Sequence, residues 1–261
     1  MTNELCDYHI HSNHSFDSEE TIENICKKAI SKNLSEICIT DHFSILNYDP
    51  SYKYFDFNKY KNEIDKVKEK YNFPIKRGLE IGEGHLKTKE LEKIIESFNL
   101  DFIIGSIHNI SELTIRKSLK KYGEENTYKK YFKELKKLAE NADYDVLGHL
   151  DLVQRYAFQE FNHLYNVKDY KNQIEEILSI VIKREKGIEV NTSSLYKNYK
   201  NTFPKTSIIK MYHDMGGKVI TIGSDAHNSN RVGEGVKEVM EVLNTLGFKK
   251  LARFKKRTLI L

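Results

Sequence analysis

The chain has 261 residues, 39% of them hydrophobic, which is enough for one large domain with a substantial core. Its formal charge is only +4 although 31% of the residues are charged, and lysine and glutamate are interleaved in helix-like stretches such as residues 60–71, so nucleic acid is not an expected partner. Three cysteines without a C-x-x-C pair, no basic-then-apolar N-terminal segment and no apolar run of about 18 residues favour a cytoplasmic protein that does not associate with a membrane.

Seven short β-branched runs follow one another along the chain, with helix-like stretches between them. These expected strands are residues 5–11, 36–42, 75–82, 101–108, 145–151, 187–192 and 218–227. Apolar residues recur at helical spacing in three of the intervals, at residues 22–30, 174–182 and 236–243. The alternation predicts parallel strands joined by right-handed crossovers, and seven such units most simply close into a (β/α)7 barrel in one α/β domain. An open doubly wound sheet is the alternative, but the chain has no Gly-rich nucleotide-binding turn.

Two longer segments, residues 43–58 and 154–169, follow expected strand ends and are rich in Tyr, Phe and Asn. We expect both to be lids over the mouth of the barrel rather than linkers between domains. No internal repeat is evident beyond the alternation of strand and helix.

Metal-capable side chains stand at the end of almost every expected strand. In chain order they are His9, His11 and Asp17, then Asp41 and His42, Glu80, His108, His149 and Asp151, and finally Asp225 and His227. The carboxyl ends of parallel barrel strands form one rim, where the active sites of such barrels are built. Residues two apart in a strand point to the same side, so His9 and His11 can face one ion while Ile10 faces the helices. The remaining histidines, His14, His85, His163 and His213, are expected to be ordinary hydrogen-bonded residues.

A set of imidazoles and carboxylates without thiolates suits divalent Zn, Mn or Fe better than a cysteine-based structural zinc site. Roughly nine ligands, at three or four for each metal, predict two to three divalent metal ions. Such ions lower the pKa of a bound water and can clamp the oxygens of a phosphoryl group. The pattern therefore predicts a metal-dependent enzyme whose ions could activate a water and hold a phosphoryl group.

These motifs also resemble those of a known family. In order, DYHIHSNHSFDSEETIE, ICITDH, GLEIG, GSIH, GHLD, EVNTS and GSDAH resemble the polymerase-and-histidinol-phosphatase (PHP) family of metal-dependent phosphoesterases, and most closely its monofunctional histidinol-phosphatase branch. The resemblance covers effectively the whole chain, residues 1–261, and implies a single domain with a distorted (β/α)7 TIM-like barrel. It also implies hydrolysis of L-histidinol phosphate to L-histidinol and inorganic phosphate, a step of histidine biosynthesis, by a metal-bound hydroxide at a trinuclear site. The alternative substrate is another small phosphomonoester or a nucleotide.

The resemblance implies a role for each rim residue. One metal would be held by His9, His11, Glu80 and Asp225, a second by Glu80 as a bridge with His108 and His149, and a third by Asp17, His42 and His227. Asp41 and Asp151 would orient imidazoles, although a helix cap is an equal alternative for Asp151. Asp225, His227 and Arg155 are the expected catalytic residues.

Arginine is scarce beside lysine in this chain, so Arg155, just after the fifth expected strand, is the leading candidate to fork onto two phosphate oxygens. The resemblance implies the same role for this position. Arg231 and Arg116 are weaker candidates for substrate binding, with surface ion pairs as the alternative.

One segment departs from the family pattern. Relatives often have N-T-S-G-L-R after the sixth strand, whereas this chain has NTSSLYK, so Tyr196 stands where relatives carry arginine and Lys197 is the neighbouring cation. The departure leaves phosphatase chemistry intact but bears on the identity of the substrate. For histidinol phosphate, the amino and imidazole groups could meet residues such as Tyr156 or Asp49.

Two other classes of protein are alternatives to this hypothesis. A metal-dependent amidohydrolase also uses H-x-H on a barrel, but no metal-bridging lysine stands at a strand end, since Lys76 precedes the rim. A binding or scaffold protein on a degenerate barrel would have lost ligands, and this set is complete. None of these patterns predicts an oligomeric state.

Overall fold

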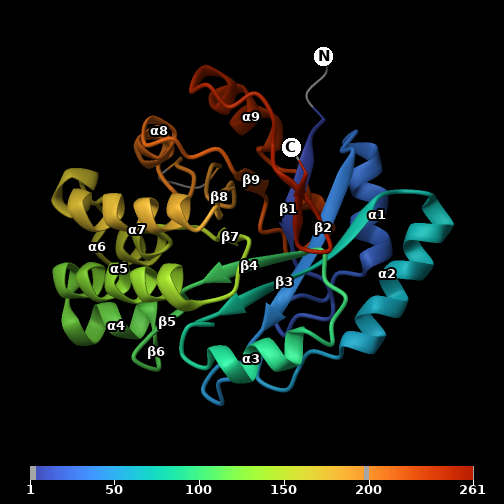
Figure 1. The fold of residues 1–261 in the computed structure, drawn as a ribbon, viewed down its shortest axis with the longest axis horizontal. Coiled ribbons are helices and arrows are strands. Elements are labelled where there is room, and N and C mark those ends of the chain that lie inside the picture. Colours follow the sequence, from blue (N-terminus) through green and yellow to red (C-terminus); the bar gives the residue numbers. More distant parts are fainter. Residues whose placement is uncertain (1–3, 197–199, 261) are drawn as a thin grey trace.

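A parallel sheet of seven strands forms the centre of the computed structural model, which describes residues 4–196 and 200–260 (Figure 1). The strands are β1 (Cys6–Ile10), β2 (Glu36–Phe43), β3 (Ile75–Gly82), β4 (Phe102–Ser106), β7 (Val146–Leu147), β8 (Gly187–Asn191) and β9 (Ile220–Gly223). They lie in this order, each parallel to the next. They correspond one to one with the expected strands, although β7 has only two residues.

The sheet curls into a nearly closed barrel because its first and last strands meet. Ile10 and Ala226 form a parallel bridge. Beside it, the His11 N–H donates to the Ala226 carbonyl oxygen at 2.9 Å, and the Asp225 N–H donates to the His9 carbonyl oxygen at 2.8 Å. The predicted single α/β domain with a distorted (β/α)7 barrel is therefore confirmed, and the open sheet is excluded.

Helices cover the outside of the barrel (Figure 1). They are α1 (Ile22–Ser31), α2 (Phe57–Tyr71), α3 (Thr88–Ile95), α4 (Ile115–Tyr122), α5 (Glu124–Asn141), α6 (Val153–Phe161), α7 (Lys171–Lys183), α8 (Thr206–Asp214) and α9 (Val236–Thr245), with the 3-10 helices η1 (Val167–Tyr170) and η2 (Ser229–Arg231). Helix α1 illustrates the cause: Thr21 caps it by accepting from the Asn24 N–H, and its apolar face is buried. The apolar faces expected on α7 and α9 are buried as well. Within the described residues, no helix combines the length and apolar character that crossing a membrane requires.

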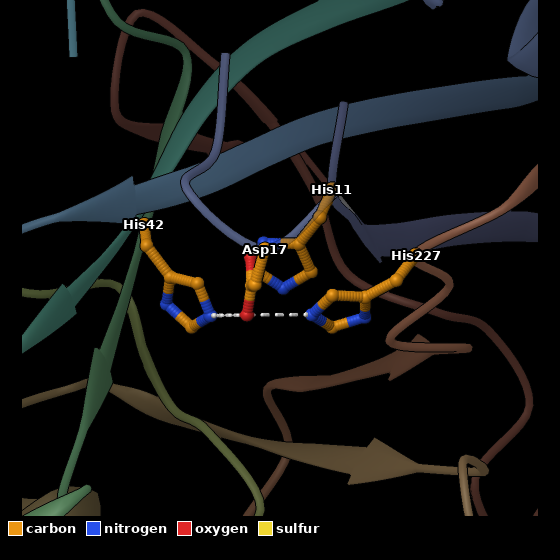
Figure 2. A group of neighbouring side chains, drawn as sticks. All are labelled: His11, Asp17, His42 and His227. Carbon is orange, nitrogen blue, oxygen red and sulfur yellow. Dashed lines mark hydrogen bonds and ion pairs between the residues drawn. The ribbon is translucent and has the colours of Figure 1, made fainter. Parts of the chain in front are cut away.

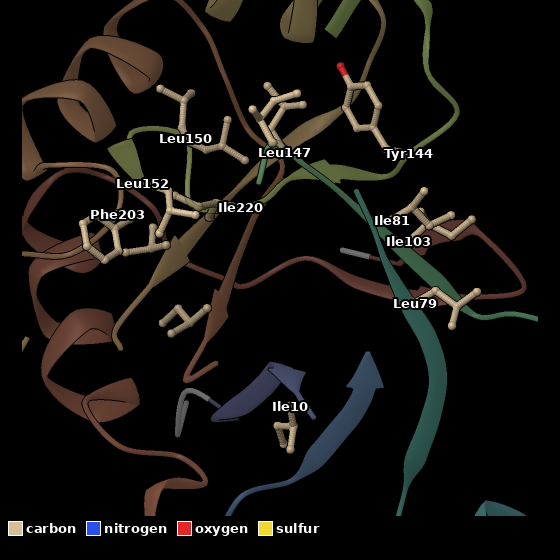
Figure 3. Packing of buried hydrophobic residues seen from close by; sticks show 14 of the residues in the cluster. Ile10, Leu79, Ile81, Ile103, Tyr144, Leu147, Leu150, Leu152, Phe203 and Ile220 are labelled. Carbon is tan, nitrogen blue, oxygen red and sulfur yellow. The ribbon is translucent and has the colours of Figure 1, made fainter. Parts of the chain in front are cut away.

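Apolar packing occurs on both sides of the strands. Outward side chains such as Ile10, Leu79 and Ile103 belong to the large cluster that also contains the buried faces of the helices (Figure 3). Side chains of opposite alternation, including Tyr8 and Phe102, form a second cluster inside the amino-terminal half of the barrel. The barrel interior is therefore filled below the rim, which leaves the carboxyl ends of the strands for a site.

The two expected lids have different structures. Residues 44–56 form turns without regular secondary structure, but most of residues 154–169 are helical, in α6 and η1. This second segment is helical because Val153, Gln154 and Ala157 recur at helical spacing and are buried.

Two antiparallel hairpins have no counterpart among the expected strands. They are β5 (Asn109–Ile110) with β6 (Leu113–Thr114), and β10 (Arg253–Lys255) with β11 (Thr258–Ile260). Each turns through two residues of positive φ, Ser111–Glu112 and Lys256–Arg257. These turns lack the glycine that usually marks such hairpins in a sequence.

Candidate metal centre

The expected rim residues converge at the carboxyl ends of the strands. The nine side chains are those of His9, His11, Asp17, His42, Glu80, His108, His149, Asp225 and His227. Several are fully buried, with exposed fractions of 0% for His9 and His11, 1% for Glu80 and 2% for His149. Ionisable groups are buried in this way when they pair with one another or bind a metal.

A β-bulge in β1 directs two of these histidines into the site. Between its pairings at Asp7 and Ile10, β1 has one residue more than its partner β2. Before the bulge, Tyr8 packs inside the barrel. Beyond it, His9 and His11 point inward and Ile10 packs outside. Because of the extra residue, the side chains of this strand that point inward are apolar before the bulge and polar after it.

Ligand atoms of His9, His11 and Asp225 lie within 4.8 Å of one another, and a Glu80 oxygen lies close to both histidines. His9 Nε2 is 3.0 Å from His11 Nε2, 3.3 Å from Glu80 Oε2 and 3.8 Å from Asp225 Oδ1. His11 Nε2 is 3.5 Å from the same Glu80 oxygen and 3.4 Å from Asp225 Oδ1. Ligands bound tetrahedrally at about 2.0–2.1 Å stand about 3.3 Å apart, so His9, His11 and Asp225 could hold one zinc-sized ion, with Glu80 Oε2 beside the two histidines.

Glu80 presents its two oxygens to two sets of histidines. Oε2 faces the group just described and also lies 2.9 Å from His42 Nδ1. Oε1 lies 3.1 Å from His108 Nε2 and 2.8 Å from His149 Nε2, and it accepts a hydrogen bond from the Ser106 hydroxyl at 2.7 Å. A carboxylate so placed is able to bridge two metals.

Asp17, His42 and His227 form a third group together with His11 (Figure 2). Asp17 Oδ2 lies 3.3 Å from His42 Nε2 and 3.2 Å from His227 Nε2. The ring of His11 is centred 4.3 Å from the rings of both His42 and His227. The three expected members are therefore together, and His11 and His42 are shared with neighbouring groups.

The charged groups of the site shift one another's pKa values. Although burial opposes it, the neighbouring carboxylates raise the pKa values of His9, His42, His108 and His227, so these rings favour the protonated form until a metal replaces the proton. Burial alone would raise the pKa of Glu80, but the imidazoles of His108, His9 and His42 outweigh it and hold this pKa well below its usual range. Asp225 behaves in the same way, with His9 the leading opposing group, so its pKa is also well below the usual range. Burial and the neighbouring imidazoles lower the pKa of His11 to about 3, so its ring is neutral near pH 7.

Two buried glutamates that contact the site were missed in the sequence. Glu189 of β8 contacts His9 Nδ1 at 2.6 Å and accepts from the His149 N–H at 2.7 Å. Glu83, just after β3, accepts from the backbone N–H of His108. The available signal was a glutamate inside the apolar run GIEV, which has no favourable place in a buried strand unless it is paired.

Asp41 and Asp151 do not orient imidazoles, contrary to expectation. Asp41 Oδ2 accepts from the Ser12 hydroxyl at 2.7 Å and its other oxygen accepts from the Ser12 N–H. Asp151 Oδ2 accepts from the Tyr165 hydroxyl at 2.9 Å and the Lys205 N–H at 3.3 Å. Nor does Asp151 cap α6, which begins without a side-chain cap. Both aspartates instead fix loops around the rim.

Asp7 and the four remaining histidines lie outside the three groups. Asp7 is buried and accepts from the backbone N–H groups of Ser224 at 2.9 Å and Gly233 at 2.7 Å, which secures the chain around β9. The remaining histidines pair with carboxylates elsewhere: His14 with Glu63, His85 with Glu134, His163 with Glu124 and His213 with Asp214.

A cavity of about 350 Å³ opens over the three groups, a size typical of small-molecule sites. Its walls include Asp17, His42, Glu80, His108, His149, Asp225 and His227, together with Phe16, Asp49, Tyr156, Arg116 and Arg155. The cavity therefore combines the candidate metal ligands with two cations and one further carboxylate.

The candidate phosphate-binding cations have different positions. Arg155 donates to the Ser193 hydroxyl and, at 3.4 Å, to Asp225 Oδ2, so it lies beside the first metal group. Arg116 lines the cavity and donates to Gln159 at 2.7 Å. Arg231 pairs with Glu234 at 2.6 Å and is not among the described residues that line the cavity. The surroundings of Arg231 therefore match the alternative to substrate binding, which was a surface ion pair.

The segment that departs from the family pattern lies partly outside the described residues. Tyr196 is 56% exposed and is not among the described residues that line the cavity. Lys197 lies outside the described residues. The substrate role predicted for Lys197 stays a prediction.

Comparison with known proteins gives a family and several relatives. The family model for the PHP domain matches residues 7–193. The chain is 32% identical to a probable histidinol-phosphatase of Thermotoga maritima, with 95% of each chain covered, and 29% identical to the histidinol-phosphatase of Lactococcus lactis, with 95% of this chain and 93% of the relative covered. The crystal structure of histidinol phosphate phosphatase from Lactococcus lactis, complexed with zinc, L-histidinol and phosphate, matches with a TM-score of 0.90 at 26% identity, over 99% of both chains.

Proposed function

This chain belongs to the PHP domain family, and we propose that it is a histidinol-phosphatase, which hydrolyses L-histidinol phosphate to L-histidinol and inorganic phosphate. The observation that carries the proposal is the convergence of nine metal-capable side chains beside a cavity that also contains Arg155. The ligands of the Lactococcus lactis structure, which are zinc, L-histidinol and phosphate, support the same assignment.

The donor set fits two to three divalent metal ions. His9, His11, Glu80 and Asp225 would hold one, Glu80, His108 and His149 a second, and Asp17, His42 and His227 a third. The spacing of His9, His11 and Asp225 and the divided oxygens of Glu80 support this arrangement. Zinc is the leading candidate because the relative's structure contains it, and manganese and iron accept the same ligands. When bound, such ions supply positive charge to the phosphoryl oxygens and acidify a coordinated water.

The protein's own contribution to phosphate binding is assigned to Arg155. Its guanidinium lies over the Phe203 ring at 4.9 Å and is tied to Ser193 and Asp225, so its direction is fixed. A planar guanidinium can donate two parallel hydrogen bonds to a phosphate. Asp225 and Arg155 would thus keep metal and phosphate at adjacent positions.

The other end of the substrate would meet the outer wall of the cavity. Asp49 is buried there, accepts from the Ser51 N–H at 2.8 Å, and offers a carboxylate to an ammonium or imidazolium group. Tyr156 lines the same wall and lies beneath the Arg116 guanidinium at 5.4 Å. A cationic leaving group such as histidinol is therefore preferred over a nucleotide, whose phosphates and sugar carry no positive charge.

We also propose that the whole chain, residues 1–261, is one domain of this family. The family match ends at residue 193, but Asp225 and His227 follow β9, which closes the barrel against β1. The site would lack two ligands without this part of the chain.

The test is the release of inorganic phosphate from L-histidinol phosphate by the zinc-loaded protein, beside a panel of other phosphomonoesters and nucleoside monophosphates. We expect the highest kcat/KM for L-histidinol phosphate, and a loss of at least about 100-fold in Asp225→Asn because one ligand is lost. His163→Asn is the control, since His163 pairs with Glu124 outside the site. Turnover of another ester alone would contradict the substrate assignment, and turnover of none, with metals bound, would contradict the phosphatase assignment.

A further inference from the structure

We propose that Glu189 is a positioning residue of the metal centre, which sets the tautomer of His9 and anchors the backbone at His149; this inference rests on the metal-dependent function proposed above. Glu189 lies in β8, a strand for which no metal ligand was expected. Its exposed fraction is 1%, so its carboxylate depends on partners within the protein.

Both oxygens of Glu189 are directed at residues of the metal groups. Oε1 lies 2.6 Å from His9 Nδ1, the ring nitrogen opposite to the one that faces His11 and Glu80. Oε2 accepts from the His149 N–H at 2.7 Å. Glu189 thus contacts two candidate ligands from distant parts of the sequence through groups that do not themselves face the centre.

The contact to His9 determines where the imidazole proton resides. A carboxylate only accepts hydrogen bonds, so Nδ1 of His9 carries a proton towards Glu189, and in the neutral ring Nε2 then presents its lone pair to the site. Only a lone pair can bind a metal ion. Partners of this kind, which hold ligating histidines from behind, typically change metal affinity by 10–100-fold when mutated.

The surrounding strands leave room for this pair and little else. A Cβ atom added to Gly223 of β9 would lie 2.3 Å from Glu189 Oε1 and 2.3 Å from His9 Cβ. Glycine is therefore required between the two side chains. This shape shows that the pair of Glu189 and His9 is built into the packing of β1, β8 and β9.

Two substitutions of Glu189 separate positioning from packing. In Glu189→Gln, the amide oxygen is needed by the His149 N–H, so the amide NH2 faces His9 Nδ1, which must then accept and shift its proton to Nε2. In Glu189→Ala, the vacated space beside His9 Nδ1 and the His149 N–H can admit water, which both donates and accepts, so neither tautomer of His9 is imposed and Nε2 stays able to ligate. The conservative change to Gln should therefore be the more harmful for metal binding.

The experiment measures zinc affinity by competition with a chromophoric chelator, and urea unfolding of the zinc-free proteins. We expect Glu189→Gln to bind zinc 10–100-fold more weakly than wild type and more weakly than Glu189→Ala, while being at least as stable as Glu189→Ala. Nitrogen-15 NMR of histidine-labelled protein in the presence of zinc should show the His9 proton on Nδ1 in wild type and on Nε2 in Glu189→Gln. Zinc binding by Glu189→Gln as tight as that of Glu189→Ala, or tighter, would overturn the inference.

Asp145→Asn is the matched control. Asp145 is also a buried carboxylate, 3% exposed, but it accepts from the Ile103 N–H at 2.8 Å and pairs with Arg257 at the amino end of β7. We expect this variant to lose stability and keep its zinc affinity, whereas an equal loss of zinc affinity would show that general destabilisation accounts for the effect of Glu189→Gln. Failure of the wild-type protein to bind zinc, manganese or iron would instead refute the proposed function itself, before any variant is compared.

Discussion

Glu80 connects the candidate metal groups at the level of single residues. Its carboxyl is 1% exposed, its pKa is held well below the usual range by the surrounding imidazoles, and each oxygen faces a different set of ligands. A buried, ionised carboxylate is stable only where positive charge nearby balances its own charge. The arrangement of Glu80 therefore explains why so many histidines from separate strands can meet in one place.

Arg155 gives the first prediction at this scale. We expect Arg155→Met to lower kcat/KM for L-histidinol phosphate by about 10–100-fold, chiefly through KM, because hydrogen bonds to a charged group contribute about 1.5–3 kcal/mol. Steady-state kinetics would measure the change, and the zinc content of the variant should equal that of wild type. Arg116→Met is the control, because Arg116 lies at the exposed edge and bonds to Gln159, so a change of only a few-fold is expected. Equal effects of the two substitutions would contradict the assignment of phosphate binding to Arg155.

At the level of elements, local sequence patterns predicted the strands and helices, because these depend on residues that are close in the chain. The runs of β-branched residues marked all seven strands, and the apolar spacing at residues 22–30, 174–182 and 236–243 marked α1, α7 and α9. The bulge in β1 was not predictable, because it is a mismatch in pairing with β2. The role of Glu189 also depends on a strand far away in sequence, since its partner His9 lies at the other end of the chain.

An ion pair between His85 and Glu134 attaches the loop that follows β3 to α5. His85 Nε2 lies 3.0 Å from Glu134 Oε2, and Lys137 Nζ lies 2.9 Å from Glu134 Oε1. The hydrogen bond with His85 is the leading cause that lowers the pKa of Glu134 to about 2, against the opposing effect of burial. The same loop contains Glu83, which accepts from the His108 N–H, so this attachment stabilises the surroundings of the rim.

This pair predicts a dependence of stability on pH. Because the folded pKa of Glu134 lies below its ordinary value of 4.5, the pair stabilises the fold fully above about pH 4.5 and loses this effect as the pH falls towards 2. We expect Glu134→Gln to be less stable than wild type by about 1 kcal/mol at pH 6, after allowance for solvent screening, and the difference to shrink as the pH is lowered to 3. Urea unfolding of metal-free proteins across this range would measure it.

The control is Glu125→Gln on the same helix, which removes an ion pair with Lys129 whose glutamate is 73% exposed. Its effect should be smaller than that of Glu134→Gln at pH 6. A difference between wild type and Glu134→Gln that stays constant or grows towards pH 3 would show that the pair does not act through the charge of Glu134.

At the level of the whole molecule, the apolar packing inside the barrel and the candidate site lie at opposite ends of the barrel. The amino-terminal half of the interior is filled by apolar side chains such as Tyr8, Phe102 and Phe254, while the polar groups converge at the carboxyl ends beside the cavity. The members of the site extend from His9 to His227, so the barrel must close before the site exists. Strand-end positions predicted which residues converge, but not which atoms face one another, because distances across the barrel depend on closure and on the short β7.

The central claim is that this protein hydrolyses L-histidinol phosphate with the help of at least two bound divalent ions. The most direct measurement is phosphate release from L-histidinol phosphate as zinc is returned stepwise to the chelator-stripped protein, with the zinc content of each sample determined. We predict no turnover in the stripped protein and a rise that requires about two or three ions per chain. Full turnover by the stripped protein, or none of this ester at full zinc occupancy, would contradict the claim.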